Sequence, residues 1–387
     1  MAGPLAGTRI VEMAGLGPGP FGAMLLADMG AEVVRVERVA SRRDDDYHAQ
    51  RDAADPRRYV LHRGRRSVAI DLKHPHGVAT VLHLVAQADA LVEGFRPGVM
   101  ERLGLGPDVC LERNERLVYG RVTGWGQGGP LAPTAGHDAT YLALTGALHS
   151  FARRGERPLP PLAMVGDMGG GGMLLAFGIV CALREADRSG RGQVVDAAMI
   201  DGVAAMSAMW FGMMAQGRWR DEPGTNFTDA GAPHYDVYET SDHRHVAVAA
   251  LEEPFYRELL TTLGLDPDQV PPRSDASRWP ELADLLASAF ASRTRDEWAD
   301  VFAHRDACVA PVLSFHEAPQ HPHHEARGTF VTRDHVVQPR PAPRFSRSEP
   351  DVGLPPPVPG EHTDEVLRDW GLDAAAVARL RTDGVIA

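Results

Sequence analysis

Two short stretches of the sequence each place an ionisable side chain beside glycine. The first, TAGHDATY at 134–141, contains His137, and the second, VGDMGGGG at 165–172, contains Asp167. His137 stands directly before an apolar stretch, so we expect it at or just before a helix N-terminus. We expect Asp167 to precede a second helix that starts among residues 169–172. Two such loops could face one cleft, which makes the pair a candidate for acid–base chemistry.

The glycine run after Asp167 has two chemical uses. A substrate can lie against a backbone that lacks Cβ atoms, and the N–H groups at a helix start favour negative charge. A carboxylate base beside such donors suits removal of a proton α to a carbonyl, because the enolate is stabilised as it forms. The same set suits attack of the carboxylate on an acyl group. From the residues alone, an N-cap role for Asp167 and a capping or core role for His137 also fit.

The order of strand-like and helix-like stretches predicts the α/β fold class. Residues 8–14 and 31–37 have strand composition and enclose a Gly/Pro loop and a helical stretch, which makes a βαβ unit. Strands are expected again at 67–71 and 90–95, around a helix at 76–89.

Two apolar helices are expected further along the chain, at about 172–188 and 199–216. Methionines lie on one face of the second helix. Core packing explains them, and a soft surface for a mobile acyl chain is the functional alternative. They are Met199, Met206, Met209 and Met213.

Residues 17–22 match the GxGxxG pattern of a dinucleotide site, and Glu37 follows where a ribose-binding acid would stand. However, Pro18 and Pro20 have no N–H to offer to a pyrophosphate. We therefore interpret this stretch as a tight turn.

Length and composition indicate a two-domain globular protein. The chain has 387 residues and a net charge of -12, which disfavours nucleic acid as a partner. Its three cysteines are far apart, and no Cys or His spacing indicates a disulfide or a metal site. We see no signal peptide and no apolar run of membrane-spanning length, so the cytoplasm is the expected location and no membrane span is expected.

Composition shifts predict the domain boundaries. Stretches rich in Gly, Pro, Asn and Asp separate a smaller inserted domain from the rest. The expected segments are 1–200 (first part of the large domain), 201–224 (linker), 225–325 (small domain), 326–340 (linker) and 341–387 (return to the large domain).

Many motifs together resemble the family III CoA-transferases and the 2-methylacyl-CoA racemases that belong with them. They include AGHDATYLALTGAL, PPLAMVGDMGGGG, GRGQVVDAAMIDGV, GFRPGVMERLGLG, HRGRRSVAIDLK, DACVAPVL, PAPRFSR and GEHTDEVL, and they cover nearly the whole chain in the same order. Gly-His-Asp at 136–138 is similar to the racemases, whereas the transferases usually carry an aromatic residue before the aspartate. The glycine-rich flap of many transferases is also missing from DAGAPHYDVYE.

The resemblance to α-methylacyl-CoA racemases implies two bases on opposite faces of the substrate α-carbon, His137 and Asp167. It also implies that Glu252 orients the histidine, although the adjacent Glu253 would take its place if the alignment slips by one residue. The thioester oxygen would meet a backbone N–H near Asp167 or Met168. The implied alternative is a CoA-transferase in which Asp167 carries the acyl group, and a non-catalytic acyl-CoA-binding relative is a third possibility.

The resemblance further implies a CoA site, a fold and an assembly. CoA is part of the substrate, so no separate cofactor and no metal are expected. The fold would be a large Rossmann-like domain built from both chain ends, with a smaller inserted α+β domain, in an interlocked homodimer. The residues expected to contact CoA are Arg38, Ile70, Asp71, Leu72, Lys73, Gly94, Phe95, Arg96, Arg102, Gly136, Asp138 and Tyr141.

Overall fold

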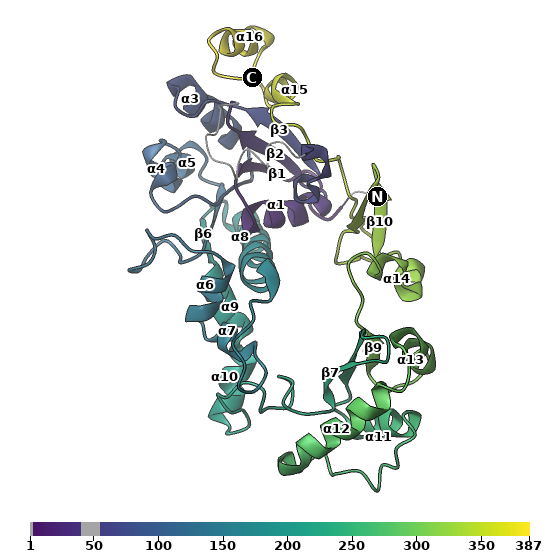
Figure 1. Ribbon diagram of the computed structural model, residues 1–387. Coiled ribbons are helices and arrows are strands. Elements are labelled where there is room, and N and C mark those ends of the chain that lie inside the picture. Colours follow the sequence, from purple (N-terminus) through teal and green to yellow (C-terminus); the bar gives the residue numbers. More distant parts are fainter. Residues whose placement is uncertain (1–2, 40–54) are drawn as a thin grey trace. The chain divides into compact units, whose positions relative to one another are not determined.

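The computed structural model describes residues 3–39 and 55–387 (Figure 1), which form two compact units. Unit 1 contains Met1–Thr145, Leu162–Met206 and Arg327–Ala387, and unit 2 contains Gly146–Pro161 and Ser207–Ala326. The N-terminal and C-terminal parts of the chain thus share one unit, as the family resemblance implies for the large domain.

A six-stranded parallel sheet forms the centre of unit 1, in the order β3-β2-β1-β4-β5-β6. This is the doubly wound order, which reverses between β1 and β4, and ligands in such sheets bind beyond the carboxyl ends of the strands at that point. The predicted α/β class is confirmed. The strands are β1 (Arg9–Met13), β2 (Glu32–Glu37), β3 (Arg65–Ala69), β4 (Ala90–Glu93), β5 (Val118–Thr123) and β6 (Val194–Ala198).

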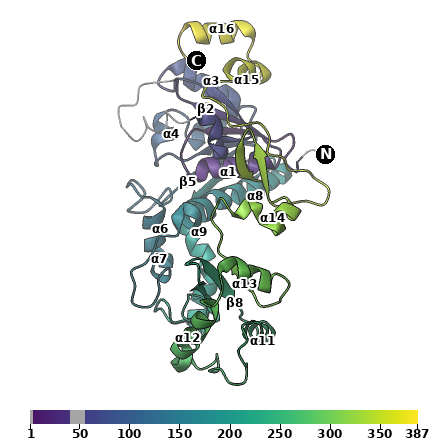
Figure 2. The ribbon, with the colours of Figure 1, turned by 45° about the vertical axis from the view of Figure 1, so that its right-hand side comes forward.

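The strands are apolar in continuous runs because both faces of the sheet are covered. Ile10 and Val33 belong to the apolar cluster on one face, while their neighbours Val11 and Val34 belong to the cluster on the other. The first face packs against α1 (Pro18–Asp28) and α8 (Leu174–Ser189), which lie side by side (Figure 2).

The opposite face contacts helices from both ends of the chain. Trp370, from the segment after α15, is fully buried there, and Ile70 bridges to Ile386. These contacts join the C-terminal helices to the first half of the sheet. The helices on this side are α3 (Pro75–Val85), α4 (Val99–Arg102), α5 (Pro107–Arg113), α15 (Thr363–Asp369) and α16 (Ala374–Thr382).

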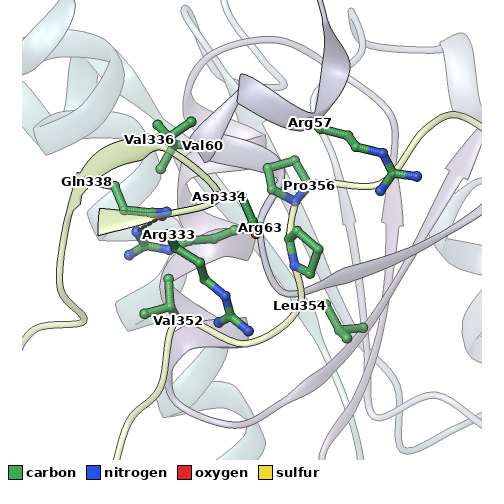
Figure 3. Close-up of a pocket in the computed structure, with 11 residues that line it drawn as sticks. Arg57, Val60, Arg63, Arg333, Asp334, Val336, Gln338, Val352, Leu354 and Pro356 are labelled. Atoms are coloured by element: carbon green, nitrogen blue, oxygen red, sulfur yellow. Dashed lines mark hydrogen bonds between the residues drawn. The ribbon is translucent and has the colours of Figure 1, made fainter. Parts of the chain in front are cut away.

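Arg63 attaches the C-terminal hairpin of β10 (Phe330–Arg333) and β11 (Val336–Pro339) to α1. Its guanidinium donates to Asp28 Oδ2 at 2.6 Å and to Gln338 Oε1 at 2.8 Å, and all three side chains are buried. Figure 3 shows Arg63 and Gln338 in a small pocket that Arg333 and Val352 also line. Loss of Arg63 or Asp28 would leave an uncompensated buried charge, and loss of Gln338 would leave a buried guanidinium N–H without this acceptor, so the arginine fixes the returning chain. Two short 3-10 helices, Pro56–Arg58 and Val60–His62, precede it.

Unit 2 is a smaller α+β unit, as predicted. Its antiparallel sheet has the order β7-β8-β9, from Tyr235–Glu239, His245–Ala249 and Val309–Pro311. Its core contains Tyr238 stacked on Phe290. The helices are α7 (Ala147–Ser150), α10 (Ala208–Ala215), α11 (Glu253–Thr262), α12 (Trp279–Phe290) and α13 (Arg295–Phe302), with 3-10 turns at Ala276–Arg278 and Ala318–Gln320; α14 (Pro322–Arg327) follows at the junction with unit 1.

Two expectations about the apolar helices need correction. The helical run Leu162–Ser189 is long and apolar enough to cross a membrane by length and composition, although no such run was expected. Its α8 part packs on α1, β5 and β6 through one buried face that includes Leu175 and Ile179, whereas Phe177 on another face is exposed. The methionine-rich helix is not continuous: α9 (Met199–Met206) ends before Ser207, and α10 begins at Ala208. Met199 and Met213 are buried, whereas Met206 and Met209 are exposed.

A buried histidine in unit 2 makes its stability depend on pH. His234 is 6% exposed, and its Nδ1 has no hydrogen-bond partner among the described residues. Burial, and to a lesser extent the charge of Arg273, lower the pKa of His234 to about 4. The unfolded chain takes up this proton near pH 6.5, so the fold loses stability as the pH falls from there towards 4.

We therefore predict that His234→Phe becomes progressively more stable than the unsubstituted protein as the pH falls from 7 to 5. Thermal melting at each pH measures the difference. The matched control is His304→Phe at an exposed position, for which the difference should not change with pH. A pH-independent difference for His234→Phe would show that this histidine is not the titrating group.

Candidate active site

Loops beyond the carboxyl ends of β1, β4 and β5 converge with two helix starts in unit 1. Gly17 follows β1 with a positive φ of 61° and caps the N-terminus of α1. The segment of Gly94 and Arg96 follows β4, and Trp125 follows β5. The helix starts belong to α6 (Asp138–Leu144) and to a π-helix, Val165–Met173, that continues into α8.

Asp167 lies inside the π-helix and beside the turn after β1. The prediction that it precedes its helix was wrong, because the glycine run is itself helical and the helix begins at Val165. A Cβ at Gly17 would lie 3.3 Å from Asp167 Oδ2, so the carboxylate packs against this bare backbone. The tight-turn interpretation of residues 17–22 needs correction, because only Gly17 lies in the turn, and residues 18–22 of the GxGxxG match already belong to α1.

The surroundings of Asp167 raise the pKa of its carboxyl to about 6. Partial burial is the largest cause, and the negative charge of Asp138 adds to it. The positive charge of His137 has a smaller effect in the opposite direction. A carboxyl group with such a pKa exchanges protons readily near neutral pH.

His137 is the N-cap residue of α6, as the sequence predicts. Its backbone is extended, and its N–H donates to Thr140 Oγ1 at 3.0 Å. The side chain is exposed. The imidazole is therefore accessible to a bound molecule.

The end of the glycine run serves packing and not substrate contact. A Cβ at Gly170 would lie 2.9 Å from the carbonyl oxygen of Met199 in α9, and one at Gly172 would lie 2.7 Å from that of Pro18 in α1. Gly170–Gly172 are buried, which rules out the expected backbone surface over this part of the run. Gly169 is partly exposed and faces Met206, so it is the glycine that remains beside the site.

Tyr141 forms one wall of the site. Its ring lies against the backbone of Gly124 and Gly136, where a Cβ would come within 2.0 and 2.5 Å of it, and it meets Trp125 edge to face. Burial raises the pKa of Tyr141 to about 12, Asp167 adds to this shift, and Arg96 opposes it. Gly136, a predicted CoA contact, therefore also makes room for this ring.

Four basic side chains follow the carboxyl ends of β2, β3 and β4. Each is exposed and forms no ion pair within residues 3–39 and 55–387. Cations without partners at this edge of a doubly wound sheet are suited to phosphate groups. They are Arg38, Lys73, Arg96 and Arg102, all predicted to contact CoA.

Other predicted CoA contacts have their backbone N–H groups engaged. The N–H groups of Ile70 and Asp71 donate to the backbone carbonyl oxygens of Glu37 and Val385, respectively. The N–H of Phe95 donates to Glu93 Oε2 at 2.7 Å. Ile70 is also fully buried. Leu72 remains partly exposed next to Lys73.

Glu252 lies in unit 2, at the N-cap of α11. Glu253, the alternative partner for His137, instead pairs with Arg273 at 3.1 Å. The carboxylate of Glu252 forms no ion pair within the described residues, and its charge raises the pKa of Cys308 as a smaller cause after burial. The orienting role of Glu252, with Glu253 as its alternative, stays a prediction.

The sequence profile of CoA-transferase family III matches residues 5–363. The chain belongs to this family. Two curated relatives share most of its length: it is 44% identical over 385 residues to alpha-methylacyl-CoA racemase of Mus musculus and 42% identical to that of Homo sapiens, in both cases over 99% of this chain and 97% of the relative. Among solved structures, a CaiB/BaiF family protein of Brucella suis superposes with a TM-score of 0.80 at 24% identity, over 96% of this chain and 100% of that one.

Three features of this family III site escaped the sequence reasoning. They are the contact of Gly17 with Asp167, the π-helix, and the position of Asp138 between the two candidate bases. Gly17, which precedes a proline in the loop after β1, was a signal for the first feature, because a glycine can adopt the positive φ that permits close approach. Nothing in the sequence distinguishes a π-turn from an α-turn.

We predict opposite outcomes for two substitutions in the glycine run. Gly172→Ala places a Cβ 2.7 Å from the Pro18 carbonyl and from the Phe21 ring, and should lower the free energy of unfolding by about 1–3 kcal/mol. Gly169→Ala meets nothing closer than 3.3 Å, and should be neutral or stabilise by up to about 1 kcal/mol. Denaturant titration of both variants measures the difference. Equal losses of unfolding free energy would contradict a special packing role for Gly170–Gly172.

Proposed function

We propose that this protein is a racemase that interconverts (2R)- and (2S)-2-methylacyl-CoA thioesters. The two relatives that bear this activity in their names align over nearly the whole chain. The observation that carries the proposal is that the hydrogen bond from the Asp167 N–H to Asp138, the neighbour of His137, joins the two helix starts at the ligand-binding edge of the sheet. The carboxyl of Asp167 is partly buried there and has a pKa of about 6.

In the proposed mechanism, one base removes the α-proton and the conjugate acid of the other returns a proton to the opposite face. The free carboxylate of Asp167 accepts the proton in one direction, and the imidazole of His137 accepts it in the other. The enolate oxygen needs a hydrogen-bond donor. Since Asp138 engages the N–H of Asp167, we assign this role to the N–H of Met168.

We propose that the CoA part binds along the carboxyl edge of the sheet. Arg38, Lys73, Arg96 and Arg102 supply charge for its phosphates, as an arginine or lysine does for any phosphate group. The partly exposed Leu72 lies beside them. CoA is then a part of the substrate and no other cofactor takes part in the proton transfer.

We also propose a homodimer. Large apolar side chains are exposed on helices of both units, among them Phe177 of α8 and Phe211 of α10, which are 67% and 54% exposed. Apolar surface of this kind marks an interaction site. An interlocked assembly would cover it, and it would agree with the resemblance to a family of such dimers.

Solvent labelling tests the reaction. A single enantiomer of a 2-methylacyl-CoA, incubated with the protein in deuterated water without any acceptor acid, should gain deuterium at the α-carbon and lose optical purity. Mass spectrometry and chiral chromatography follow the two changes. Exchange that requires an added carboxylic acid, or a hydroxylamine-sensitive adduct on Asp167, would instead indicate CoA transfer. Binding of the thioester with neither outcome would indicate a non-catalytic acyl-CoA-binding protein.

Loss of either base should abolish racemisation but leave exchange from one enantiomer. We predict that His137→Ala and Asp167→Ala each lower racemisation at least about 100-fold. Each variant should exchange the α-proton of a different enantiomer, because the two bases serve opposite faces. His316→Ala and Asp108→Asn, both at exposed positions, are the controls and should keep full activity. Similar retention of racemisation in both base variants would contradict the two-base scheme.

A further inference from the structure

The carboxylate of Asp138 joins the two helix starts of the site. Asp138 is the first residue of α6, directly after His137, and it is 7% exposed. Its Oδ1 accepts a hydrogen bond of 2.7 Å from the backbone N–H of Asp167. The residue next to one proposed base therefore holds the backbone of the other.

The chain makes room for this bond at Gly166. A Cβ at that position would lie 2.5 Å from Asp138 Oδ1 and 3.4 Å from the Asp138 carbonyl oxygen. Gly166 is buried, and no side chain fits between the π-helix and α6 at this point. Any larger residue at 166 would push the carboxylate away from the Asp167 N–H.

The second oxygen of Asp138 is the unusual feature. Oδ2 is buried and has no hydrogen-bond partner among the described residues. Leaving a buried carboxylate oxygen unpaired costs free energy, so stability alone does not account for an acid here. An asparagine would accept the same N–H with its side-chain oxygen and would not bring a charge.

The charge has a consequence for the neighbouring acid. It is the second cause, after burial, of the raised pKa of Asp167, because two carboxylates close together oppose each other's ionisation. Asp138 thus acts on Asp167 in two ways, through one hydrogen bond and through its charge.

We propose that Asp138 is a positioning residue for the α-proton transfer, whose carboxylate holds the Asp167 backbone at the start of α6 and does not contact the CoA phosphates. The proposal rests on the racemase function proposed above. A buried anion with one oxygen engaged by the protein is also poorly suited to a ligand that carries phosphates.

Two substitutions separate the hydrogen bond from the charge. Asp138→Asn keeps an oxygen for the Asp167 N–H, so kcat should stay within about threefold. Without the charge, the pKa of Asp167 falls, and the limb of the pH–rate profile that Asp167 governs should move to lower pH by about half a unit to one unit. Asp138→Ala loses both effects and should lower kcat at least about tenfold, with KM for the thioester little changed.

Gly166→Ala tests the hydrogen bond between the Asp167 N–H and Asp138 Oδ1 independently. It leaves Asp138 in place but displaces its carboxylate, and should reproduce the loss of kcat seen in Asp138→Ala. Asp108→Asn removes the same charge from the exposed first turn of α5 and is the matched control, with no expected shift of the profile.

Hydrogen exchange gives a readout that does not need activity. The Asp167 amide, measured in full-length protein by mass spectrometry of a peptide around residue 167, should exchange faster in Asp138→Ala and Gly166→Ala than in Asp138→Asn or the unsubstituted protein. If the unsubstituted protein fails to label any thioester, the racemase function falls, while amide protection still decides whether Asp138 positions Asp167. Unchanged amide exchange in Asp138→Ala, or a raised KM with an unchanged pH profile in Asp138→Asn, would overturn the proposal.

Discussion

Close contact between the π-helix and α1 is the constraint from which the geometry of the site follows. Gly170–Gly172 let this backbone approach Pro18 and Met199 at distances that no side chain would allow. That approach brings Asp167, only a few residues earlier, to the turn after β1. The first strand of a doubly wound sheet ends at the switch point where ligands bind. The glycines thus place the Asp167 carboxylate at the end of the sheet where ligands bind in this topology.

Much of the architecture could be predicted because apolar runs and turn residues are local signals. The parallel strands and the smaller second unit agree with predictions from these signals, whereas the return of the C-terminal segment was implied by the family resemblance. The break at Ser207 was missed because an apolar helix face continues across it in the sequence. Residues 201–224, predicted as a linker, contain most of α9 and all of α10. Periodicity reports which face is apolar, and it does not report whether tertiary contacts keep a helix continuous.

The candidate site was predictable in its residue types but not in its contacts. Histidine and aspartate beside glycine pointed to acid–base chemistry, yet the sequence does not show that Asp138 faces Asp167 and not solvent. A hydrogen bond between residues 29 positions apart depends on how two helix starts meet. The same limit applies to Glu252 and Glu253, because the ion pairs of Glu253 with Arg257 and Arg273 become visible only in the structure.

At neutral pH the carboxyl group of Asp167 is ionised, although the surroundings in the fold disfavour this ionisation. A carboxyl group whose pKa is about 6 in the fold, against about 3.9 in the unfolded chain, binds its proton more tightly in the fold. Its ionisation therefore destabilises the fold as the pH rises through this interval. Packing of α1, α8 and the glycine run must offset that cost at neutral pH. An acid this easily protonated can both take and return a proton, which a fully solvated aspartate does poorly near pH 7. The unfavourable ionisation of Asp167 is consistent with the proposed racemisation, because Asp167 and His137 must each act as base in one direction and as acid in the other.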